Sequence, residues 1–104
     1  GLDVGNQQMG QMKLDSTGGN VENTNVENTN VKIASFKFAN VKGANLKNTN
    51  VNRAELSQAD LTGADVTGAD LNAAEINNAN FKDVVGLDTV KNWGKTEGKC
   101  INCR

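Results

Sequence analysis

Residues 59–73 read ADLTG ADVTG ADLNA, three blocks of five in which a small, a polar and a large apolar residue follow in the same order. The same order extends in both directions without a slip, from Gly19 to Asp83. A fixed short period is typical of a repeat architecture, and it decides the fold before any other feature does.

The large apolar residue recurs every five positions, and the residue two positions before it is always Gly, Thr or Ala. The residue between the two is Asn, Asp, Glu or Ser in every repeat. The thirteen large residues are Val21, Val26, Val31, Phe36, Val41, Leu46, Val51, Leu56, Leu61, Val66, Leu71, Ile76 and Phe81.

A period of five suits neither a helix nor a straight strand. Five residues of an α-helix advance about 500°, so successive apolar residues would spread around the whole circumference. Side chains of a strand alternate between faces, so successive apolar residues would point to opposite sides. The chain must instead turn once per repeat and wind around an interior, with the polar residue outside. Asn, Asp and Thr suit the corners because their side chains bond to nearby backbone.

These blocks, together with ANLKN at 44–48, closely resemble the pentapeptide repeat family, whose consensus is A(D/N)LXX. The resemblance covers residues 19–83 and implies an all-β solenoid, a right-handed quadrilateral β-helix with four repeats per coil. On that count residues twenty apart stack on one another, and the thirteen repeats make slightly over three coils.

The flanks lie outside the repeat and are expected to cap it. Residues 1–18 form an N-terminal capping segment, residues 19–83 the β-helix, and residues 84–104 a C-terminal cap with a Cys-containing tail.

The C-terminal cap is expected to contain a short helix over about 88–93. Leu87, Val90 and Trp93 are spaced by three, Asp88 is placed to cap the helix, and Gly94 is placed to end it. Trp93 is then a plug for the last coil, with a binding aromatic as the alternative.

Composition argues against several function classes. The net charge of −1 matches neither the basic face of a nucleic-acid binder nor the acidity of a nucleic-acid mimic. The chain lacks His, the commonest general base and metal ligand, so neither a catalytic site, a metal nor another cofactor is expected. No run approaches the roughly 18 apolar residues of a membrane helix, so membrane insertion is not expected.

Four features of the sequence depart from the scaffold pattern and are candidate sites. Outward Ile33 and Phe38 form either a contact for the N-terminal segment or a small docking patch. Basic residues precede an acidic run of Glu55, Asp60, Asp65, Asp70 and Glu75, which we expect on successive faces, not in one column. This run is either a solvated wall or a docking surface for a basic partner. The tail carries Trp93 and a Cys pair.

Cys100 and Cys103 are expected to form a disulfide, with free thiols as the alternative. A structural zinc site usually needs four ligands, which residues of this kind cannot supply here. A disulfide suits an oxidising compartment. The chain begins at Gly1, as a trimmed form would. Some members of the family that it resembles are exported to the thylakoid lumen or periplasm, and the resemblance implies such a compartment here.

The pattern as a whole predicts a non-enzymatic structural or protein-interaction module with an unknown protein partner, as a monomer or weak oligomer. One alternative is a DNA mimic that binds a topoisomerase, as some family members do. Another is a small thiol–disulfide redox protein that uses Cys100 and Cys103.

Overall fold

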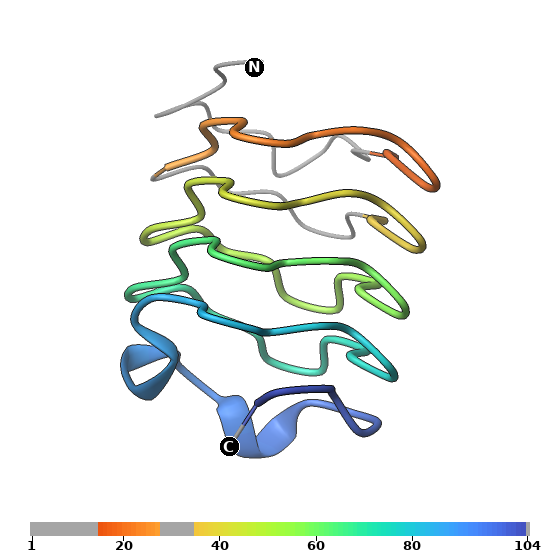
Figure 1. Cartoon of the computed structure of the whole chain (residues 1–104). Helices are drawn as coiled ribbons and strands as arrows, with labels where there is room; N and C mark the ends of the chain where they lie inside the picture. Colours follow the sequence, from red (N-terminus) through yellow and green to blue (C-terminus); the bar gives the residue numbers. More distant parts are fainter. Residues whose placement is uncertain (1–14, 28–34, 104) are drawn as a thin grey trace.

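The computed structural model describes residues 15–27 and 35–103, which form a stack of coils along one axis (Figure 1). Parallel bridges join residues twenty positions apart, from the pair Asp15–Ser35 to the pair Asp65–Val85. The first of these pairs lies partly within the expected N-terminal cap, of which residues 1–14 fall outside the described residues. Residues twenty apart therefore stack, as the resemblance implied.

In the part of the chain that the structure describes, coils contact one another through single bridged residues rather than extended strands. The bridged residue is the polar residue of each repeat. Its N–H donates to the preceding coil, as from Asp60 to the carbonyl of Ala39 at 3.0 Å. The next N–H donates to the following coil, as from Leu61 to the carbonyl of Asn80 at 2.8 Å. The chain turns again before a longer strand can form.

A tight turn separates each repeat from the next. The carbonyl of Leu61 accepts a hydrogen bond from the N–H of Ala64 at 2.8 Å, and other repeats make the same bond. The residue before Ala64 is Gly63, whose φ of 71° lies in the left-handed region. A left-handed third residue is the mark of a type II turn. This turn is the corner that returns the next apolar side chain to the interior.

The interior is filled by the residues that the period predicts to face inward. The buried large residues are Val26, Phe36, Val41, Leu46, Val51, Leu56, Leu61, Val66, Leu71, Ile76 and Phe81. Val21 is partly buried, and the members of the pattern within 28–34 lie outside the described residues. Each fully buried Val, Leu, Ile or Phe stabilises the stack by roughly 1.5–3 kcal/mol. The buried hydroxyl of Thr49 donates to the carbonyl of Val26 at 2.8 Å, which satisfies it.

Beyond Phe81 the pairing continues but its register changes. Two 3-10 helices, η1 (Leu87–Thr89) and η2 (Trp93–Lys95), take up the additional residues at the end of the stack (Figure 1). The last three bridges join residues 21 or 22 positions apart, namely Asp70–Lys91, Glu75–Glu97 and Asn80–Ile101.

The expectation of one helix over about 88–93 is wrong. Left-handed residues, Gly86 with φ 80° and Asn92 with φ 62°, precede η1 and η2, and the backbone between the two helices bridges to the previous coil. Asp88 lies inside η1 and Gly94 lies inside η2, so neither caps nor ends a helix as expected. Pairing with the stack has overridden the local helical spacing.

Candidate functional site

Phe38 is the most conspicuous outward side chain among the regular repeats. It is 52% exposed, and its φ of 62° is left-handed, a region that large side chains rarely adopt. Its N–H donates to the carbonyl of Ser57 at 3.1 Å, which holds the turn in register with the next coil. The ammonium of Lys37 lies 5.6 Å from the ring centroid. Its expected neighbour in this patch, Ile33, lies outside the described residues.

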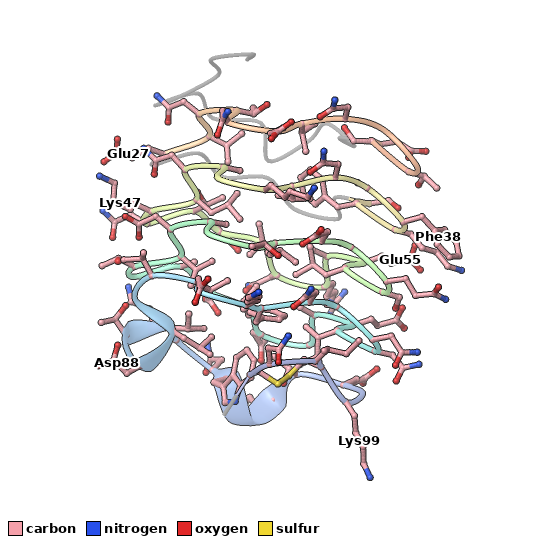
Figure 2. The ribbon with its side chains drawn as sticks, viewed as in Figure 1. Glu27, Phe38, Lys47, Glu55, Asp88 and Lys99 are labelled. Atoms are coloured by element: carbon pink, nitrogen blue, oxygen red, sulfur yellow. A yellow bond between two sulfur atoms is a disulfide. The ribbon has the colours of Figure 1, made fainter. Side chains whose placement is uncertain are left out.

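Glu55 lies on the same side of the stack as Phe38, opposite Glu27 and Lys47 (Figure 2). The prediction that the acidic run lies on successive faces, with no column, is wrong at its end. Glu55 bridges to Glu75, which bridges to Glu97, so these carboxylates share one face. A period of twenty already brings Glu75 beneath Glu55. Within the described ranges, no three His, Cys or acidic side chains form a group that could hold a metal ion.

The three aspartates of the run form hydrogen bonds within their own turns. The carboxylates of Asp60, Asp65 and Asp70 each accept a hydrogen bond from the N–H two residues later, at 3.0 to 3.1 Å. Side chains that bond in this way stabilise local turns. These aspartates therefore have a structural role that Glu55, with its longer side chain, does not share.

Two of these carboxylates have lowered pKa values. The Thr62 hydroxyl, which donates to Asp60 at 2.6 Å, is the main cause of its lowered pKa, and the Thr62 N–H and Lys42 add to it. For Asp65, desolvation is the largest influence and raises the pKa. Hydrogen bonds from the hydroxyl and N–H of Thr67, with a smaller effect of Lys47, outweigh it and lower the pKa overall.

Two lysines also lie close to carboxylates on neighbouring coils. Lys42 lies 3.9 Å from Asp60, and Lys47 lies 3.8 Å from Glu27. These groups are solvent-exposed, and exposed pairs contribute little stability. Some of the basic and acidic side chains thus pair with one another within the molecule.

The end of the stack brings the tail candidates together. Cys100 and Cys103 form a disulfide, and the ring of Trp93 meets that of Phe81 edge-on, with centroids 5.6 Å apart. An open cavity of about 350 Å³ lies beside them. It is lined by Ile76, Trp93, Thr96, Gly98, Lys99, Cys100 and Cys103. The sequence does not predict this cavity, because it lies in a coil whose register departs from the period of twenty.

A family model described as pentapeptide repeats, with eight copies, matches residues 34–72 and 52–85. Together the two matches run from 34 to 85, which is half of the 104 residues. No curated protein matches the chain.

Solved structures resemble the chain as well. A pentapeptide repeat protein of the Arabidopsis thaliana thylakoid lumen is 27% identical, with a TM-score of 0.72 over 89% of this chain and 59% of that one. The chain thus spans 59% of the length of that relative. A pentapeptide repeat protein of the cyanobacterium Cyanothece is 18% identical, with a TM-score of 0.53 over 97% of this chain and 84% of that one. At that identity the second likeness shows the fold alone.

A plasmid-mediated fluoroquinolone resistance protein also matches, at 14% identity over 85% of this chain and 58% of that one. Its TM-score of 0.47 carries no argument about function. No helix in residues 15–27 and 35–103 has the length and apolarity needed to cross a bilayer.

Proposed function

The chain belongs to the pentapeptide repeat family, and on that premise we propose that it is a non-enzymatic module that binds a protein partner through the face bearing Phe38. We propose with this that the stack is a right-handed quadrilateral β-helix, as its relatives imply. The buried residues serve as scaffold in this proposal, and specificity comes from outward residues that depart from the repeat.

The observation that carries the proposal is the exposed ring of Phe38. Every described repeat is left-handed at this turn position, with Gly or Asn at many turns and Arg53, Gln58 and Ala73 at others. Among these described turns, Phe38 alone places an aromatic ring there, and it is 52% exposed. A half-exposed aromatic held at such a position is a suitable anchor, because aromatic side chains dominate binding energy at interfaces.

The partner is tested by cross-linking the full chain in native extract and quantifying the captured protein. Phe38→Asn removes the ring and leaves a residue that left-handed turns accept, so this variant is expected to be at least as stable as the parent. Capture of a partner that uses Phe38 is expected to fall about tenfold or more, the scale of an interface hot spot.

The matched control is Gln58→Asn, which introduces the same residue at the equivalent left-handed position of the next coil. This variant is expected to retain the partner. Equal capture by the parent and by both variants would show that the Phe38 face is not the docking surface.

We also propose that the protein works in an exported compartment, the thylakoid lumen or the periplasm. The Cys100–Cys103 disulfide and the thylakoid-lumen relative support this location. Fractionation of source cells with an antibody to the chain tests it, and recovery with the cytosolic marker would contradict it.

A further inference from the structure

The disulfide stands at the last bridge of the stack. Ile101 lies between the two cysteines, and its N–H donates to the carbonyl of Ala79 at 2.7 Å. Its carbonyl accepts from the N–H of Phe81 at 2.8 Å. The bond between Cys100 and Cys103 thus closes the short loop that carries both of these hydrogen bonds.

This last bridge also covers the end of the core. Cys100, Cys103 and Trp93 are partly buried and pack against the core cluster that contains Phe81. Figure 2 shows the disulfide, drawn as a yellow bond, at the C-terminal end of the stack. If the loop opened, the apolar surface of Phe81 and Ile76 beneath it would become accessible.

The two cysteines are also partly exposed to solvent. Both cysteines are only partly buried, both line the open cavity beside Trp93, and Ile101 between them is 46% exposed. Exchange requires that a thiol of another molecule can approach the disulfide bond. Such a thiol can approach it here while the stack stays folded.

We propose that Cys100–Cys103 is a thiol–disulfide exchange site for a dithiol protein, and that it acts as a latch on the terminal coil. This proposal does not depend on a partner at Phe38. A thiolate of the dithiol protein attacks one sulfur, the bond between Cys100 and Cys103 breaks, and the other cysteine leaves as a thiolate that takes a proton. The second thiol of the protein then resolves the mixed disulfide. The chain gains two electrons and two protons, and the dithiol protein becomes a disulfide.

Reduction removes the constraint on the four-residue loop while the middle coils keep all their contacts. For a loop of this size, chain entropy alone raises the opening constant on the order of tenfold. Segments with few buried contacts open locally, separately from the rest of a protein. The reduced form would then present an apolar surface around Trp93 that the oxidised form covers.

Hydrogen exchange on the full chain, with and without dithiothreitol, tests both parts of the proposal. Thiol alkylation followed by mass spectrometry reports reduction, and amide exchange is followed at Ile101, Phe81 and Leu61. We expect dithiothreitol to reduce the native protein and to speed exchange at Ile101 and Phe81 about tenfold or more. Leu61, in the middle of the stack, should be unaffected.

The double variant C100S/C103S is the matched control and should exchange quickly at Ile101 whether or not reductant is present. Reduction that occurs only in denaturant would overturn the exchange site. Equal exchange at Ile101 in both redox states would overturn the latch. Faster exchange at Leu61 as well would also overturn it, because the disulfide would then be a general cross-link.

Discussion

The middle coils, residues 35–83, and the terminal coil, residues 84–103, use the same parallel bridges but differ in how the chain leaves each bridge. In the middle coils a large inward residue follows the bridge directly, and the left-handed residue comes two positions later, as in Asp60, Leu61 and Gly63. In the terminal coil the left-handed residue follows at once, as Gly86 follows Val85. The inward residue that follows each bridge in the middle coils therefore has no equivalent in the terminal coil.

The terminal coil fills its interior in another way. Leu87 and Trp93 reach it from the 3-10 helices, and both remain only partly buried. Close backbone contact replaces side-chain packing at Gly98, where a Cβ would lie 2.9 Å from the backbone nitrogen of Asn77. Backbone pairing and core formation are thus separable in this fold. The terminal coil keeps the backbone bridges but buries its side chains less completely.

The largest expected effect comes from a charge in the middle of the stack. Leu61 is 1% exposed, and Leu61→Asp would bury an unpaired carboxylate in a narrow interior, at a cost of roughly 4 kcal/mol or more. Leu87→Asp makes the same change in the partly buried terminal coil and should cost about 1 kcal/mol, because the carboxylate can reach water. Denaturant unfolding followed by circular dichroism measures both, and equal losses would remove the distinction between the two regions.

Overfilling the small-residue position should give the next largest effect. Ala64 is fully buried, and Ala64→Leu is expected to destabilise the stack by about 1–3 kcal/mol because the interior cannot widen without breaking bridges. Val84 stands before a bridge in the terminal coil, as Ala64 does in the middle, and is only partly buried. Val84→Leu should therefore cost less than about 1 kcal/mol. A Val84→Leu loss as large as that of Ala64→Leu would show that the terminal coil is packed as tightly.

The inward residues of the middle coils are predictable from sequence because each repeat restates the same steric requirement. The terminal coil is not, because the spacing of Leu87, Val90 and Trp93 suits a short helix as well as an interrupted coil. Long-range pairing decides between them, and the bond between the N–H of Lys91 and the carbonyl of Ala69, at 2.8 Å, has no local signature.

The candidate sites were predictable to different degrees. The sequence predicts a disulfide between Cys100 and Cys103, and the structure places their sulfur atoms at bonding distance. The exposed ring of Phe38 is predictable, since Gly or Asn fills the same repeat position at many other turns. The cavity beside Trp93 depends on the shifted register of the terminal coil, which no residue pattern shows.

Acid should weaken the middle coils through their turn aspartates. The pKa values of Asp60 and Asp65 are lowered in the folded state, so their stabilising contribution is present above the ordinary pKa of 3.8 and is lost as pH falls through the folded values. In D60N/D65N the amide oxygens can still accept the turn hydrogen bond, as Asn45 does, but they do not titrate. Unfolding midpoints between pH 7 and pH 2.5 should fall less for this variant. Parallel curves for the two proteins would contradict the role of these carboxylates.

The smallest effect concerns one hydroxyl of the outer wall. The hydroxyl of Thr62 donates to Asp60 at 2.6 Å. Thr62→Val should raise the pKa of Asp60 towards its ordinary value and cost less than about 1 kcal/mol, while Thr62→Ser should preserve both. Thr96 of the terminal coil donates instead to the carbonyl of Trp93, so Thr96→Val should leave the pKa of Asp60 unchanged. Titration of the Asp60 carboxyl by NMR separates these cases, and a pKa unmoved by Thr62→Val would mean that the backbone N–H and Lys42 suffice to lower it.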